Sequence, residues 1–198
     1  MKQFWNERYA ESNFAYGKDC NLFLKENLHF LPKGKVLFVA EGEGRNAVFA
    51  AKNGFEVSAF DYSESGKQKA FLLANENGVP IDYLVSDVLE LPYEKEIFDG
   101  LVLIFAHFPA EIRKHAHLKL LELLKPGGKI LFEAFGKEQL NYTSGGPKDI
   151  DMLFSEEEVK NEFPDVVITS LSTEKIVLDE GLFHQGEGVV VRFIGTKK

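Results

Sequence analysis

The chain has 198 residues, 44% of them hydrophobic and 27% charged, which is the balance of a globular protein with one good core, so we expect a single domain over residues 1–198. The formal net charge of −8 argues against a nucleic-acid partner and favours a small-molecule substrate, because binding phosphates requires a basic face. The only cysteine, Cys20, excludes an internal disulfide, and the lack of a signal peptide or a membrane-spanning apolar run leads us to expect a cytoplasmic protein.

Short apolar runs alternate with helical patterns through the first two thirds of the chain. The runs at residues 36–39, 56–60, 81–85, 100–105 and 129–132 predict strands that are covered on both faces. Amphipathic stretches at residues 46–53, 63–77 and 110–125 predict helices. Because such units join through right-handed crossovers, the alternation predicts an α/β protein with a mostly parallel, doubly wound, Rossmann-like sheet.

The pattern changes after residue 135. A long loop at residues 141–149 includes Tyr142 and Lys148, which we consider as substrate contacts. Ser155 followed by Glu158 predicts a capping box that opens a short helix. The β-rich runs at residues 166–178 and 188–195 have no helix between them and therefore predict an antiparallel hairpin at one sheet edge.

Residues 36–47 are typical of a strand, a tight turn and a helix. Gly42 and Gly44 lie where the backbone bends sharply and approaches a ligand, and the free N–H groups of the following helix favour an anion. That anion is a pyrophosphate in a dinucleotide enzyme or the methionine carboxylate of S-adenosylmethionine. Since Gly42-x-Gly44-x-x-Ala47 also fits the relaxed dinucleotide fingerprint, an NAD(P)-dependent oxidoreductase stays an alternative.

Two acidic residues follow the second and third predicted strands. Asp61 stands where a carboxylate binds the ribose hydroxyls of a nucleoside; its alternative role, capping the next helix, can be filled by Ser63. Asp87 ends the third run at the same sheet edge, where it can accept a hydrogen bond from an adenine amino group. Its alternative is a solvated loop carboxylate.

Several motifs together resemble a known family over nearly the whole chain. They are residues 5–9 (Trp-Asn-Glu-Arg-Tyr), residues 16–17 (Tyr-Gly), residues 42–47 (Gly-Glu-Gly-Arg-Asn-Ala), Asp61, Asp87 and residues 124–131 (Leu-Lys-Pro-Gly-Gly-Lys-Ile-Leu). The chain resembles class I S-adenosylmethionine-dependent methyltransferases, in particular the tellurite-resistance and thiopurine methyltransferase-like branch.

The resemblance implies a seven-stranded sheet of order 3-2-1-4-5-7-6 with the last strand antiparallel, and S-adenosylmethionine as cofactor. Gly42 and Gly44 would then approach the methionine part, Asp61 the ribose, and Asp87 with the Val88 backbone the adenine. The rest of the expected cofactor site comprises Tyr16, Ala40, Glu41, Arg45, Tyr62 and Phe105.

One departure from the family pattern concerns the acid before the glycine turn. Many members carry Asp-x-Gly-Cys-Gly where this chain has Phe38, Val39, Ala40, Glu41 and Gly42. We hypothesise that Glu41 replaces the missing acid and faces the ammonium or sulfonium of the cofactor, since opposite charges attract in a semi-buried site. A non-catalytic S-adenosylmethionine-binding protein is a further alternative.

Two residues after the fourth and fifth strands are candidates for catalysis. His107 is placed to act as a general base or to orient the substrate, with a backbone-bonded histidine as its alternative. Glu133 lies on an apolar run, so it either lines the pocket or forms a salt bridge. We expect His115 and His117 to face solvent, and His184 either to reach over the site from the hairpin bend or only to shape the turn.

Overall fold

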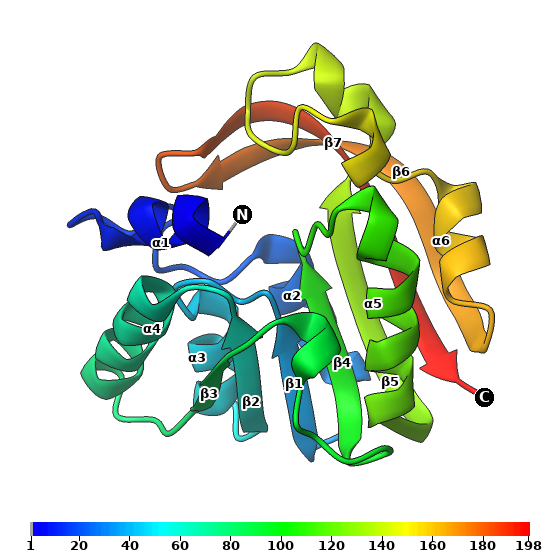
Figure 1. The fold of residues 1–198 in the computed structure, drawn as a ribbon, viewed down its shortest axis with the longest axis horizontal. Coiled ribbons are helices and arrows are strands. Elements are labelled where there is room, and N and C mark those ends of the chain that lie inside the picture. The colour runs from blue at the N-terminus through cyan, green and yellow to red at the C-terminus, as the bar shows by residue number, and fades with distance from the viewer. Residues whose placement is uncertain (1) are drawn as a thin grey trace.

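The computed structural model describes residues 2–198, which form a seven-stranded sheet of order β3-β2-β1-β4-β5-β7-β6 (Figure 1). The strands β1 to β5 are parallel where they pair, and β7 is antiparallel to both β5 and β6, as the resemblance implied. The strands are β1 (Lys35–Val39), β2 (Glu56–Asp61), β3 (Asp82–Val85), β4 (Phe98–Ile104), β5 (Leu124–Phe135), β6 (Val166–Glu180) and β7 (His184–Lys197).

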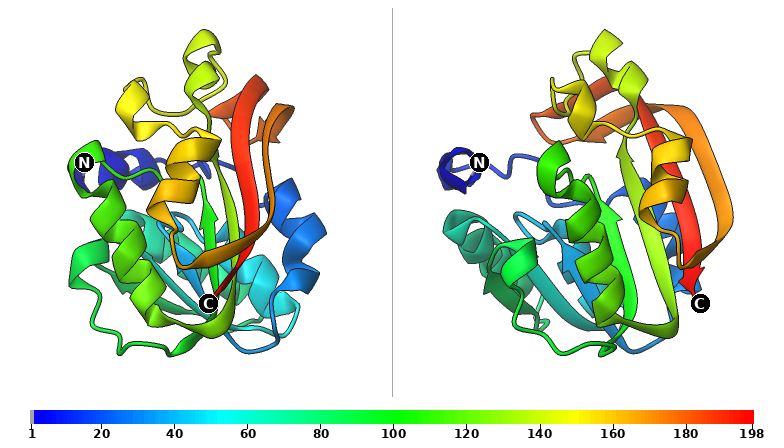
Figure 2. Two further views of the ribbon diagram at one scale, coloured as in Figure 1. Left: turned by 90° about the vertical axis from the view of Figure 1, so that its right-hand side faces the viewer. Right: turned by 45° about the vertical axis from the view of Figure 1, so that its right-hand side comes forward.

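Helices cover both faces of this sheet (Figure 2). One apolar core lies between the sheet and α5 with α6, and a second lies between the opposite face and α2 with α3. The α-helices are α1 (Lys2–Ala10), α2 (Leu22–Asn27), α3 (Arg45–Lys52), α4 (Glu64–Glu76), α5 (Ala110–Leu123) and α6 (Glu156–Glu162). Short 3-10 helices are η1 (Leu28–Phe30), η2 (Val88–Glu90), η3 (Lys137–Asn141) and η4 (Ile150–Met152).

The predicted caps form as expected. The Ser63 hydroxyl accepts from the N–H of Gly66 at the start of α4, and Ser155 with Glu158 makes the capping box of α6. Such caps satisfy N–H groups that have no partner inside the helix. The terminal hairpin is longer than predicted, because pairing continues to Glu180 and His184. His184 is therefore the first residue of β7, and only residues 181–183 form the turn.

The two histidines of α5 differ in environment. His115 is exposed, as predicted, whereas His117 is fully buried, so its predicted solvent-facing position is wrong. His117 packs against the rings of Phe154 and Phe163, which flank α6 in the connection between β5 and β6. The helices of residues 2–198 include none that combines the length and apolar character needed to cross a membrane.

Candidate functional site

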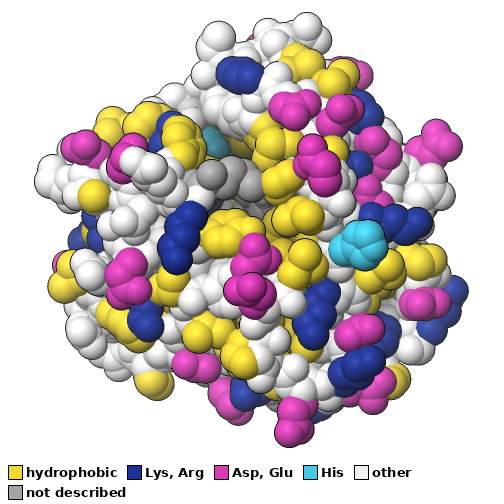
Figure 3. Space-filling view, viewed as in Figure 1, with side chains coloured by type: hydrophobic (Ala, Val, Ile, Leu, Met, Phe, Trp, Pro, Cys, Tyr) yellow, Lys and Arg dark blue, Asp and Glu magenta, His cyan; other side chains and the backbone are white. Residues whose placement is uncertain are grey.

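A cavity of about 530 Å³ opens beyond the carboxyl ends of β1, β2 and β4. This is the edge where open α/β sheets bind ligands, and the volume lies within the usual range for small-molecule sites. Apolar side chains gather around the hollow between α1 and α5 (Figure 3). The cavity is lined by Phe4, Trp5, Arg8, Tyr9, Tyr16, Ala40, Glu41, Arg45, Asn46, Asp61, Tyr62, Ile104, Phe105, His107, Phe108, Phe135, Gly146, Pro147, Lys148, Asp149, Met152 and His184.

Most of the expected cofactor residues meet at this cavity. Those that line it are Tyr16, Ala40, Glu41, Arg45, Asp61, Tyr62 and Phe105. Those that do not are Gly42, Gly44, Asp87 and Val88. Of the two candidate catalytic residues, His107 lines the cavity and Glu133 does not.

The glycine turn bends as expected, but the glycines face protein rather than the cavity. Gly42 and Gly44 have φ values of 63° and 87°, a region that favours glycine. A Cβ on Gly42 would lie 2.6 Å from the hydroxyl oxygen of Tyr9, and one on Gly44 would lie 2.6 Å from the Cβ of Ala70 in α4. The close approach that the missing Cβ atoms allow is thus to α1 and α4, and contact between the backbone of these glycines and a ligand stays a prediction.

Two residues that are not glycine adopt left-handed conformations at the cavity. Ala40 has a φ of 50° at the end of β1, and Phe105 has a φ of 54° at the end of β4. This region is unfavourable for residues with a Cβ, and such strain tends to occur at functional sites. Both residues turn the chain where it borders the cavity.

Glu41 supplies a hydrogen-bond acceptor to the start of α3. Its Oε1 accepts hydrogen bonds from the N–H groups of Asn46 and Ala47, at 2.9 and 2.8 Å. The sequence led us to expect that the N–H groups at the start of α3 would bind a ligand carboxylate. Two of them instead donate to the Glu41 side chain. Loss of hydration raises the pKa of the Glu41 carboxyl to about 7, against the effect of these hydrogen bonds.

The carboxylate of Asp61, at the floor of the cavity, is held by two backbone N–H groups. Its two carboxylate oxygens accept from the N–H groups of Gly42, at 3.1 Å, and Ser63, at 2.9 Å. Because Ser63 caps α4 with its own hydroxyl, Asp61 is left to face the cavity. Burial raises its pKa to about 6.

Asp87 reaches the cavity only through a neighbour. Its Oδ2 accepts from the hydroxyl of Tyr62 at 2.9 Å, and its Oδ1 accepts from the N–H of Leu89 and so caps η2. Val88 is buried in the core. Tyr62, rather than Asp87, therefore presents its side chain to a ligand.

His107 has both ring nitrogens occupied by the backbone. Its Nδ1 lies 2.8 Å from the carbonyl oxygen of Met152, and its Nε2 accepts from the N–H of Phe135 at 3.2 Å. Burial lowers the pKa of the ring to about 4. This geometry speaks against His107 as a base, because the lone pair that would take a proton already has a donor.

Glu133 forms the salt bridge that was its alternative role. It is fully buried and pairs with the Nε of Arg192 at 2.5 Å, and it also accepts from the Nδ2 of Asn21 at 2.6 Å. Burial raises the pKa of its carboxyl, although Arg192 opposes this shift. Because its side chain lies outside the cavity, Glu133 has no contact with a reacting group there.

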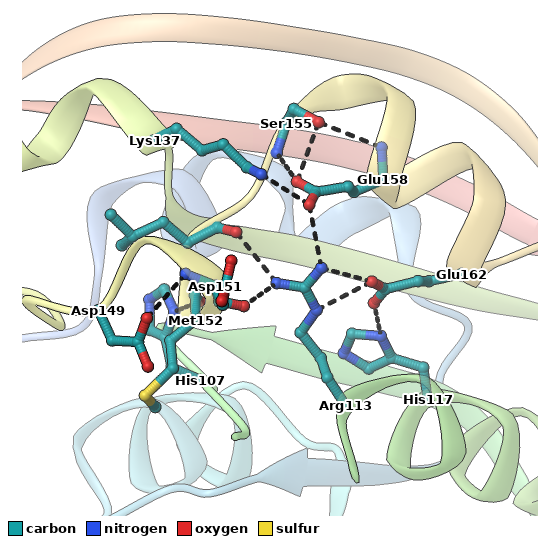
Figure 4. Close-up of polar contacts among 11 residues, drawn as sticks. His107, Arg113, His117, Lys137, Asp149, Asp151, Met152, Ser155, Glu158 and Glu162 are labelled. Atoms are coloured by element: carbon teal, nitrogen blue, oxygen red, sulfur yellow. Dashed lines mark hydrogen bonds and ion pairs between the residues drawn. The ribbon is translucent and has the colours of Figure 1, made fainter. Parts of the chain in front are cut away.

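A buried ionic cluster holds one wall of the cavity in place (Figure 4). Arg113 of α5 donates from Nη1 to the carbonyl oxygens of Asp151, at 2.7 Å, and Leu153, at 3.0 Å. Its guanidinium also pairs with Glu162 of α6 at 2.6 Å, and Glu162 in turn contacts the Nδ1 of His117 at 2.7 Å. The segment between these carbonyls includes Met152, which lines the cavity.

The N-terminal helix α1 contributes side chains to the cavity. The predicted strands and helices of the sheet gave no indication of them. Trp5, Arg8 and Tyr9 of α1 line the cavity, and only their part in the family motif indicated a role. Arg8 donates from Nη1 to the hydroxyl of Tyr16 at 3.0 Å, and its guanidinium lies 4.1 Å from the centre of the Phe183 ring. Helix α1 thus joins the cavity to the β6–β7 turn.

His184 also lines the cavity, from the start of β7. Its Nδ1 lies 3.2 Å from Oε2 of Glu180, which in turn pairs with Nη2 of Arg45 at 2.8 Å. The ring packs against Tyr16 and Phe105, with centroid separations of 4.4 and 4.7 Å. Arg45 is therefore committed to Glu180 and to the carbonyl oxygen of Tyr16, so it is not a free cation for the cofactor.

Comparisons with known proteins agree with this architecture. Residues 36–128 match the family model described as Methyltransferase domain. The ubiquinone biosynthesis O-methyltransferase of Rickettsia conorii is 30% identical over 115 residues, which cover 58% of this chain and 39% of that relative, so the match spans less than half of the relative's length.

Two solved structures share the fold. A SAM-dependent methyltransferase from Methanosarcina mazei has a TM-score of 0.73 at 15% identity, over 90% of this chain and 98% of that one. TehB from Haemophilus influenzae also has a TM-score of 0.73, at 16% identity, over 100% of this chain and 67% of that one. At these identities the likeness shows a common fold.

Proposed function

We propose that this chain, a class I S-adenosylmethionine-dependent methyltransferase by its fold and its methyltransferase domain, transfers a methyl group to a small apolar or aromatic acceptor. The observation that carries the proposal is the composition of the cavity at the carboxyl edge of the sheet. The carboxylates of Glu41 and Asp61 lie at its floor, and aromatic side chains such as Phe105 and Phe135 form its walls.

The residues at the cavity fit S-adenosylmethionine. Asp61 offers a carboxylate to the ribose hydroxyls, and Tyr62 lies beside it for the adenine ring. Glu41 uses only Oε1 in hydrogen bonds to residues 2–198, so Oε2 is available to the cationic ammonium. The electron-rich face of Tyr16 suits a sulfonium, since aromatic rings attract cations.

When bound, S-adenosylmethionine supplies an electrophilic methyl group on a sulfonium. The protein then has to hold the acceptor atom in line with that methyl group. Phe105 and Phe135, stacked with their ring centroids 4.6 Å apart, provide a rigid apolar surface for this purpose. Met152, in the segment held from α5 through Arg113, also lines the cavity.

The class of acceptor is supported by the charge of the cavity and by the relatives. A net charge of −8 favours a small molecule over nucleic acid, while Arg8 and Lys148 give the cavity local positive charge. The name of the Rickettsia relative, an O-methyltransferase, supports an oxygen acceptor. The resemblance of the sequence motifs to the tellurite-resistance and thiopurine methyltransferase-like branch is the reason to test sulfur, selenium and tellurium nucleophiles as well.

Trp5 provides a direct test of the cofactor. It is the only tryptophan in the sequence, and it lines the cavity. We expect S-adenosylmethionine and S-adenosylhomocysteine to change its fluorescence with saturation, and NADH to cause no saturable change once its own absorption of the emitted light is corrected for. Asp61→Asn should weaken binding of both adenosyl ligands, whereas Asp82→Asn, at an exposed position in β3, should not. Binding of NADH alone would contradict the proposal.

A further inference from the structure

The hairpin turn brings a histidine and a carboxylate together over the cavity. His184 begins β7 and Glu180 ends β6, and the Nδ1 of His184 lies 3.2 Å from Oε2 of Glu180. Within residues 2–198 no hydrogen bond is made to Nε2 of His184, and the ring lines the cavity. A Cβ on Gly145 would lie 3.2 Å from this Nε2, so glycine at position 145 leaves room beside it.

Glu180 is itself held as an anion. It receives hydrogen bonds from Nη2 of Arg45, at 2.8 Å, and from Nδ2 of Asn21, at 3.0 Å. Burial opposes ionisation, but the contacts with His184 and Arg45 lower the pKa of this carboxyl to about 2. An ionised Glu180 holds the imidazole proton on Nδ1, which leaves the lone pair on Nε2.

We propose that His184 is the general base for acceptors that carry a removable proton on a hydroxyl or thiol, and that Glu180 positions its ring. This inference rests on the proposed methyltransferase function. As the acceptor oxygen or sulfur bonds to the methyl carbon, the bond from that carbon to the sulfonium sulfur breaks and its electron pair stays on the sulfur. The acceptor's proton passes to Nε2 of His184, so charge and atoms balance.

The surroundings keep His184 neutral and therefore able to accept a proton. Burial is the main cause that lowers the pKa of its ring, and Arg45 and Arg8 add to this effect, while Glu180 opposes it. The other ionisable groups that face the ring are Tyr16, against which it packs, and His107, with which it interacts electrostatically. His107 does not compete for the role, because both of its nitrogens are bonded to the backbone.

Nitrogen-15 NMR of the imidazole rings tests the arrangement without any acceptor. In the complex with S-adenosylhomocysteine at neutral pH, we expect the His184 proton on Nδ1 and none on Nε2. Glu180→Gln should abolish this preference for one tautomer, while Glu187→Gln, at an exposed position in the same hairpin, should preserve it. A proton on Nε2 of the wild-type ring would overturn the inference.

Two acceptors that differ in their need for a base provide the catalytic test. Phenol must lose a proton when it is methylated, and iodide carries none. We expect His184→Gln to lower the ratio of the phenol rate to the iodide rate by about 100-fold or more, the usual contribution of a positioned base. The phenol rate should rise with pH and level off in the wild type, but rise without a plateau in the variant.

Two outcomes separate the failure of this inference from that of the proposed function. If wild type and variant bind S-adenosylhomocysteine equally and the rate ratio is unchanged, His184 is not the base. If the wild type does not bind S-adenosylhomocysteine, the proposed function itself fails. A normal ratio in Glu180→Gln together with an altered ratio in His184→Gln would remove Glu180 from the positioning role.

Discussion

At the scale of single residues, two buried carboxyl groups at the cavity floor bind their protons more tightly than they do in the unfolded chain. Burial raises the pKa of Glu41 to about 7 and that of Asp61 to about 6, above the values of 4.5 and 3.8 for the free groups. The folded protein therefore holds protons that the unfolded chain releases. Their contribution to stability is complete below the unfolded pKa values and is lost as the pH rises through about 6 to 7.

This linkage predicts the behaviour of Glu41→Gln. The amide oxygen can still accept from α3, but the group no longer ionises. Relative to the wild type, the variant should gain stability between pH 5 and pH 8, by at most about 3 kcal/mol for a shift of this size. Urea unfolding at several pH values measures the difference, which would be flat with pH if Glu41 titrated normally.

Glu41→Gln should weaken the binding of the cofactor, although it stabilises the fold. An ionised Glu41 attracts the ammonium group, so binding of S-adenosylmethionine should release a proton near pH 6.5 in the wild type and less in the variant. Calorimetry in buffers of different ionisation enthalpy reports this proton directly. Equal proton release by both proteins would remove Glu41 from the cofactor site.

Two glycines with similar backbone angles allow the stability cost of overpacking to be separated from the cost of the left-handed backbone conformation. Gly44 has a φ of 87° and its position for a Cβ is filled by Ala70, whereas Gly54 has a φ of 81° and no atom within 4 Å of that position. Gly54→Ala should cost about 1–2 kcal/mol of stability, from the left-handed conformation alone. Gly44→Ala should cost about 1–3 kcal/mol more, because it also overpacks the contact with α4. Equal losses in thermal unfolding would contradict this separation.

At the scale of elements, Arg113 ties α5 and α6 to the segment that carries Met152. The guanidinium is buried with Glu162 and two backbone carbonyls as partners, and removing one side of a buried ion pair leaves the other uncompensated. Arg113→Ala should therefore destabilise the protein by about 3–5 kcal/mol. Lys114→Ala, at the next and exposed position of α5, should change stability by no more than about 0.5 kcal/mol. A mild effect of both replacements in urea unfolding would show that the cluster is not needed to hold α5 and α6 together.

The sequence predicted the strands of the sheet better than it predicted the helices at the N-terminus. The strands were predicted because buried runs, helical periods and a terminal hairpin leave strong local patterns. Their order came from the resemblance to class I methyltransferases and not from these patterns. Helices α1 and α2 were not predicted: α2 has only six residues, and α1 turns its aromatic side chains toward the cavity and α4 instead of the sheet. The carboxyl-edge position of Asp61 and Glu41 followed from parallel strands, whereas the pairing of His184 with Glu180 depended on the length of a turn, which the residue pattern did not define.

At the scale of the whole molecule, the cavity lies between helix α1 and the sheet, which otherwise make few contacts with each other. Helix α1 packs mainly against α4, while its Trp5, Arg8 and Tyr9 face the cavity opposite the sheet. A bound ligand would contact α1, β1, β2 and the start of β7 together. Ligand binding should therefore stabilise α1 locally as well as the fold globally, because a ligand that binds only the folded state shifts both equilibria.

Hydrogen exchange distinguishes these two effects. With S-adenosylhomocysteine at about 100 times its dissociation constant, the fold should gain about 2.7 kcal/mol, which raises the melting temperature by about 5–10 °C for a chain of this size. Exchange at residues 2–10 should slow strongly even under conditions where global unfolding is negligible, because the ligand blocks local opening of α1. Residues 156–162 of α6 contribute nothing to the cavity and provide the internal control. Equal slowing in α1 and α6 would mean that the ligand acts only on global stability and that α1 is not part of its binding site.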